Sequence, residues 1–88
     1  MKRGAECKSA DENLGSQVSV ADCAKACKEK TGCKYFSYGF GSKAKRCYWE
    51  KTQSADCPEG WETDDYNFYE MPSMFCWIRV ISYIFFIF

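Results

Sequence analysis

The chain has 88 residues, among them seven cysteines and no histidine, and its twelve basic and twelve acidic residues leave a formal net charge of zero. This balance argues against binding to nucleic acid or to an anionic membrane surface, and the length allows one domain at most. Because cross-links between cysteines persist only in oxidising compartments, the composition predicts a disulfide-stapled extracellular module.

The N-terminal part of the chain is polar. Residues 1–17 are expected to form loops, with Cys7 as their only anchor. Residues 1–6 are assigned to a truncated or flexible N-terminus, because they run directly into polar sequence without the apolar region of a signal peptide. The extracellular interpretation therefore implies that the chain is part of a longer secreted or membrane-anchored protein.

A helix is predicted next, beginning after Ser19 and closed by Gly32 in a left-handed cap position. Ser19 and Asp22 form an S-x-x-D capping box, in which the serine oxygen accepts a hydrogen bond from the first turn. Val18 is expected to pack against Cys23 as a hydrophobic staple.

The predicted helix carries Cys23 and Cys27 four residues apart, so both sulfurs leave the same face and point at one partner surface. The simplest partner is a hairpin formed by residues 34–40 and 46–50. Its connection, residues 41–45, is short and rich in turn-forming residues.

Two further segments follow the hairpin. Residues 52–63 are predicted to form a loop around Cys57-Pro58. Residues 65–70 alternate poorly but are aromatic enough to form a closing strand.

The hydrophobic tail, residues 72–88, differs in character from the rest of the chain and contains the odd seventh cysteine, Cys76. As a helix its apolar part, residues 74–88, would span roughly 22 Å and is interrupted by Arg79, so it is too short to cross a bilayer as it stands. The main interpretations are a membrane anchor cut short and an artefact of the assigned reading frame, and the minor one is a genuine functional tail. A membrane partner is expected only in the first case.

No catalytic role is assigned to any residue. Histidine is absent, and Cys76 has no base beside it. The close carboxylates, Glu59 with Glu62 and Asp64 with Asp65, are interpreted as a solvated loop and the flank of a strand.

Structural zinc is the alternative to disulfides, because Cys23, Cys27, Cys33 and Cys47 offer four thiolates. Zinc sites usually use paired C-x2-C units on tight turns, whereas the first pair here lies on a helix at x3 spacing. Zinc is therefore the minor interpretation, and no metal or cofactor is expected.

The helix and the hairpin carry a recognisable pattern. It consists of S-V-A-D-C-A-K-A-C at residues 19–27, G-C-K-Y-F-S-Y at residues 32–38 and K-R-C-Y-W at residues 45–49. Over residues 7–70 the chain resembles the PAN/apple domain superfamily. The later segments, S-A-D-C-P-E-G-W and Y-N-F-Y-E, look like the variant found in cysteine-rich surface proteins of algae and other protists.

The resemblance implies an α+β fold, in which one central helix packs on a curved antiparallel β-sheet over residues 7–71. It places Phe36 and Trp49 in the core. It also implies one of the many pairings that six cysteines allow, namely Cys23–Cys47, Cys27–Cys33 and Cys7–Cys57.

The resemblance further implies a non-catalytic extracellular module that binds a protein or a carbohydrate. The expected binding surface is the hairpin tip, where cations beside aromatic rings would suit an acidic glycan. Its candidate residues are Lys43, Lys45, Arg46, Tyr38, Phe40 and Tyr48. In the alternative interpretation the cations only solubilise a turn and half of the rings are core. The alternative function is a small secreted effector or protease inhibitor that binds through one loop.

Overall fold

The computed structural model describes residues 1–72, so the hydrophobic tail from residue 73 onwards, including Cys76, lies outside the described residues. In chain order its elements are β1 (Ala5–Cys7), β2 (Asp11–Ser16), α1 (Val20–Lys28), β3 (Tyr35–Gly39), the short 3-10 helix η1 (Gly41–Lys43), β4 (Arg46–Glu50), β5 (Trp61–Thr63) and β6 (Tyr66–Glu70). No helix among these residues has the length and hydropathy that a membrane crossing requires.

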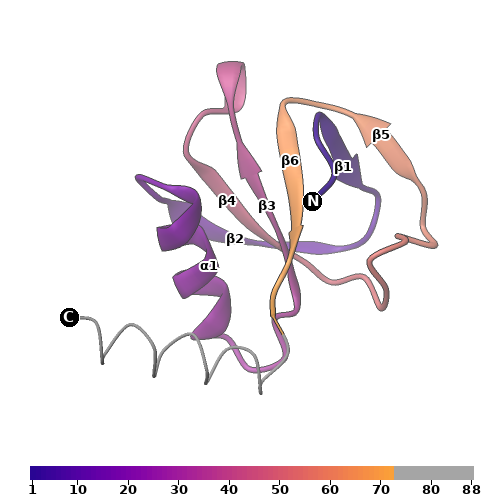
Figure 1. Cartoon of the computed structure of the whole chain (residues 1–88), viewed down its shortest axis with the longest axis horizontal. Coiled ribbons are helices and arrows are strands. Elements are labelled where there is room, and N and C mark those ends of the chain that lie inside the picture. Colours follow the sequence, from indigo (N-terminus) through magenta and orange to yellow (C-terminus); the bar gives the residue numbers. More distant parts are fainter. Residues whose placement is uncertain (73–88) are drawn as a thin grey trace.

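The strands form two antiparallel sheets. The larger sheet has the order β2–β4–β3–β6, and β1 pairs with β5 in the smaller one. Helix α1 lies on one side of the larger sheet and the β1–β5 sheet on the other (Figure 1). The predicted α+β fold, with one helix on antiparallel strands, is confirmed.

Helix α1 begins where the capping box predicts. The backbone N–H of Asp22 donates to the Ser19 hydroxyl oxygen over 3.1 Å, while the backbone of Ser19 is extended. The helix ends earlier than predicted, at Lys28, and Gly32 takes its left-handed φ of +86° in the turn that follows. The predicted staple is wrong: Val18 is 77% exposed, because the sheet already buries the helical cysteine that it was to cover.

The core between α1 and the sheet is built around sulfur and aromatic rings. Cys23, Cys27 and Cys47 are completely buried, and Phe36 is 3% exposed. Trp49 is paired with Phe36 across β3 and β4 and packs against this core while half-buried. Of the two rings predicted for the core, Phe36 therefore lies inside it and Trp49 at its margin.

Three disulfides connect the elements, in the pairs that the resemblance implies. Cys23–Cys47 joins α1 to β4, and Cys27–Cys33 joins the last turn of α1 to the segment before β3. Cys7–Cys57 joins β1 to the loop before β5, across 50 residues of sequence. The four thiolates that a zinc site would need are thus consumed in two of these bonds.

Strand β2 is a correction to the loop predicted for residues 1–17. Asp11 pairs with Glu50 and Asn13 with Tyr48, and the register then shifts before Ser16. As an edge strand β2 leaves most of its side chains in solvent, so its sequence is polar and shows no apolar alternation.

The smaller sheet was also missed, because its strands are only three residues long. Cys7 pairs with Trp61 in it, so the end of the predicted loop over residues 52–63 is a strand. The ordered module also begins before Cys7: the N–H of Lys2 donates to the carbonyl oxygen of Phe68 over 2.9 Å, and Ala5 is buried.

We expect the three disulfides to stabilise the domain in the order of the loops that they close. In the chain-entropy model, loops of 6, 24 and 50 residues correspond to about 2, 3.5 and 4 kcal/mol of unfolding free energy. Cys27→Ser with Cys33→Ser should therefore cost less than Cys7→Ser with Cys57→Ser, as measured by urea unfolding. Equal losses, or the reverse order, would contradict the stapled-module interpretation.

Candidate functional site

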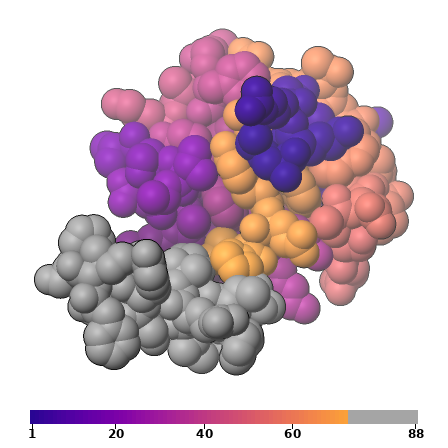
Figure 2. Space-filling view, in the orientation of Figure 1, coloured from indigo at the N-terminus to yellow at the C-terminus, as the bar shows by residue number. Residues whose placement is uncertain are grey.

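The connection between β3 and β4 is a tightly packed turn at the upper edge of the molecule (Figure 2). A Cβ on Gly39 would lie 1.9 Å from the carbonyl oxygen of Lys43, so only glycine fits there. The N–H of Phe40 donates to the carbonyl oxygen of Asp65 over 2.9 Å, and the Ser42 hydroxyl donates to the Asp65 carboxylate over 2.6 Å. The turn is therefore fastened to the segment that connects β5 and β6.

Four side chains at this turn form what we call the tip surface: Lys43, Arg46 and Tyr48, together with the buried Tyr66 on which Lys43 and Tyr48 pack. The ammonium group of Lys43 lies 5.3 Å from the centre of the Tyr66 ring, and the Tyr48 ring meets that ring edge-on at 5.9 Å. Burial raises the pKa of Tyr66, while a side-chain hydrogen bond with Arg46 opposes that rise. A neutral phenol is thus surrounded by two cations and a second ring.

One of these cations is held by a carboxylate. The Lys43 ammonium lies 3.2 Å from the Asp64 carboxylate, and this hydrogen bond raises the pKa of Lys43. The pKa of Asp64 is lowered, first by the backbone N–H of Asp65 and also by Lys43. Lys43 is therefore a positioned ammonium whose charge is largely compensated.

The six residues predicted for ligand binding do not all come together. Lys43, Arg46 and Tyr48 belong to the tip surface. Tyr38 lies on the opposite face, the one that α1 covers, and its hydroxyl donates to the carbonyl oxygen of Gln17 over 2.7 Å. The reason is the register: Tyr38 pairs with Cys47, and successive residues of a strand alternate between faces.

The remaining two predicted residues flank the turn, Lys45 exposed and Phe40 42% exposed. Sequence reasoning missed Tyr66, Asp64 and Asp65 as parts of this site. The aromatic closing strand and the paired acidic residues were visible, but nothing in the sequence shows that they lie beside the hairpin turn.

A comparison with protein families now identifies the chain. The model of the PAN domain matches residues 2–74. The chain belongs to the PAN domain family. Searches of the curated proteins and of the solved structures found no match.

PAN domains are generally non-catalytic modules that bind proteins or carbohydrates. In this PAN domain the three disulfides indicate an oxidising, extracellular environment. The family match starts before Cys7, in agreement with the pairing of Lys2 with Phe68.

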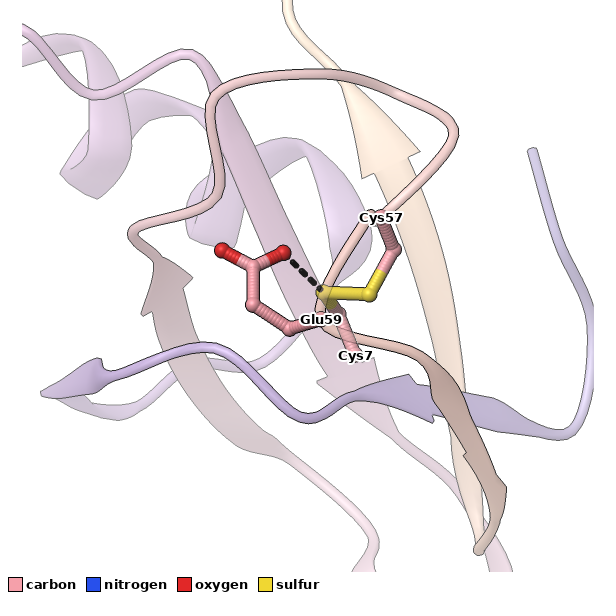
Figure 3. Close-up of side chains that lie close together, drawn as sticks. All are labelled: Cys7, Cys57 and Glu59. Carbon is pink, nitrogen blue, oxygen red and sulfur yellow. Dashed lines mark hydrogen bonds between the residues drawn. A yellow bond between two sulfur atoms is a disulfide. The ribbon is translucent and has the colours of Figure 1, made fainter.

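A second group of chemically interesting side chains surrounds one disulfide of the PAN domain. Figure 3 shows the Glu59 carboxylate pointing at the sulfur of Cys7, at 3.7 Å, beside Cys57. The same carboxylate oxygen accepts a hydrogen bond of 2.7 Å from the Thr52 hydroxyl. Because both sulfurs are bonded to each other, they offer no thiolate, and the three residues do not form a metal site of the cysteine type.

A third feature is a carboxyl group inside the PAN domain. Glu50 is 1% exposed and accepts hydrogen bonds from the hydroxyls of Ser37, over 3.0 Å, and Ser9, over 3.2 Å. Burial raises its pKa to about 8, with the charges of Asp11 and Glu6 acting in the same direction. The folded domain therefore favours the protonated form of this side chain.

We expect the stability of the domain to fall as the pH rises towards alkaline values. In the unfolded chain Glu50 ionises at its ordinary pKa of 4.5, whereas in the fold it keeps its proton up to about 8. Between these values the folded state binds more protons, so the unfolding free energy should decrease by about 1.4 kcal/mol per pH unit and level off beyond them.

Urea unfolding across this pH range measures the decrease. Glu50→Gln imitates the protonated carboxyl and should flatten the curve, while Glu70→Gln, an exposed glutamate on β6, should leave it unchanged. A Glu50→Gln variant that keeps the full slope would contradict the assignment to Glu50.

Proposed function

We propose that this PAN domain is a binding module of a larger secreted or surface protein, and that it contacts an acidic glycan at the hairpin tip. The observation that carries the proposal is the exposed pair Lys45 and Arg46 at the turn, where Arg46 lies next to Tyr66 and the half-buried Tyr48 packs on that ring. An arginine fork matches a sulfate or carboxylate group, and the exposed part of the Tyr48 ring can contact a sugar, while the buried Tyr66 supports that ring.

The rigidity of the turn supports this assignment. Gly39 permits the close approach of the chain to Lys43, and Asp65 holds both Phe40 and Ser42. A surface that is already ordered loses less conformational entropy when a ligand binds. The tip therefore presents its cations in a defined arrangement.

The lysines near α1 differ from the exposed cations of the tip, because a carboxylate compensates their charge. Lys30 and Lys51 both pair with the Glu12 carboxylate, at 3.0 and 3.4 Å. Within residues 1–72, Lys43 is the only cation of the turn that forms an ion pair, and its partner is Asp64. We therefore assign the attraction of an anionic ligand to Lys45 and Arg46, and a positioning role to Lys43.

Retention of the full chain on immobilised heparin, a sulfated glycan, tests the proposal. Replacing both Lys45 and Arg46 by alanine should lower the salt concentration of elution and weaken binding by about tenfold or more, since each charge-assisted contact contributes roughly 1 kcal/mol or more.

The matched control replaces Lys8 and Lys34, two exposed lysines outside the tip, by alanine and changes the net charge by the same amount. We expect this variant to elute close to the unmodified chain. Equal shifts in both double variants would show that only the overall charge matters and would eliminate the tip as the glycan site.

A further inference from the structure

Glu50 lies where the two sheets of the domain meet. It ends β4 in the larger sheet, next to Asp11 at the start of β2, and Glu6 approaches from β1 in the smaller sheet. Carboxylate oxygens of these three residues lie within 4.8 Å of one another. Glu50 is buried, Glu6 is half-buried and Asp11 is exposed.

The neighbours of Glu50 supply hydrogen bonds but little compensating charge. Ser37 on β3 and Ser9 before β2 donate to its two oxygens, and the charged groups that act on it most strongly are Asp11 and Glu6. Like charges at such separations repel strongly in a partly buried site. The three carboxyls are therefore not expected to be fully ionised together at neutral pH.

Further negative charges from the neighbouring elements act on Glu6. Its pKa is raised by burial first, and then by Asp64 from the β5–β6 connection, Glu62 on β5 and Asp11 on β2. Lys43 acts in the opposite direction. The charged groups that act on Glu6 are therefore acidic, apart from Lys43 on the side of the turn.

This junction is connected to the tip surface through Asp64. Its backbone N–H donates to the carbonyl oxygen of Gly4, the residue before β1, over 3.2 Å, and the charge of its carboxylate raises the pKa of Glu6. The same carboxylate holds Lys43 at 3.2 Å. A displacement of β1 would therefore move Asp64 through its hydrogen bond with Gly4, and with it Lys43.

We propose that Glu50, with Glu6 and Asp11, forms a proton-dependent latch between the two sheets. With a proton bound, the cluster carries one negative charge fewer, so Glu6 on β1 can lie close to Glu50 and Asp11 on the larger sheet. At alkaline pH the proton leaves Glu50 for the solvent, and the three carboxylates repel one another. The smaller sheet then packs less tightly on the larger sheet, and the ion pair between Asp64 and Lys43 weakens. That the latch controls ligand binding depends on the function proposed for the tip. The latch itself does not depend on that function.

An NMR titration of the full chain without any glycan tests the latch. We expect the side-chain carboxyl carbon of Glu50 to titrate with a midpoint of about 8 and the backbone amides of β1 and β5 to shift with the same midpoint. In Glu50→Gln these amide shifts should disappear, and in the control variant Glu70→Gln they should persist. A transition that appears with the same midpoint in all three proteins, Glu50→Gln included, does not arise from Glu50.

Two results would overturn the latch: a Glu50 carboxyl that titrates in the ordinary acidic range, or an unchanged β1 and β5 transition in Glu50→Gln. The side-chain resonances of Lys43 and Tyr66 test the connection to the tip, and they should follow the same midpoint in the unmodified chain and in Glu70→Gln but not in Glu50→Gln. If β1 and β5 respond while Lys43 does not, the connection is wrong. Because no glycan is present, these outcomes are independent of heparin retention.

Discussion

The Cys23–Cys47 disulfide is the constraint on which the rest of the structure depends. A domain of this size recovers little free energy from its core, and both sulfurs lie where α1 crosses β4, without exposure to solvent. By fixing β4 against the helix, the bond also fixes which residues of β4 face the other way. Along β4, Arg46 and Tyr48 alternate with the buried Cys47. The disulfide on one face of the strand therefore fixes the position of the tip surface on the other face.

The two faces of the larger sheet have different roles. Toward α1 the sheet offers sulfur and aromatic rings, centred on Phe36, and the result is a small apolar core. Away from α1 it carries the second sheet, which is held by the Cys7–Cys57 bond and by the packing of Trp61 on Phe68 at 4.8 Å. The buried polar side chains of Ser37 and Glu50 lie on this second face, beside an apolar cluster around Tyr35 and Phe68.

The burial of Glu50 is difficult to explain as a contribution to stability. Removing a carboxyl group from water is unfavourable even when two serine hydroxyls, from Ser37 and Ser9, donate to it. An apolar side chain of similar size would avoid this cost. A carboxyl at the junction of the two sheets is better explained as the proton-binding group of the proposed latch with Glu6 than as a source of folding stability.

The sequence by itself determined the features that depend on neighbouring residues. The cap formed by Ser19 and Asp22, and the common direction of the two helical cysteines, follow from local geometry, as does the hairpin. Only the tertiary structure shows that the polar residues 11–16 form the edge strand β2, on which face Tyr38 lies, and that Lys43 contacts Asp64. These depend on strand register and on contacts between residues far apart in the chain, and a one-residue shift in register would move every side chain of a strand to the other face.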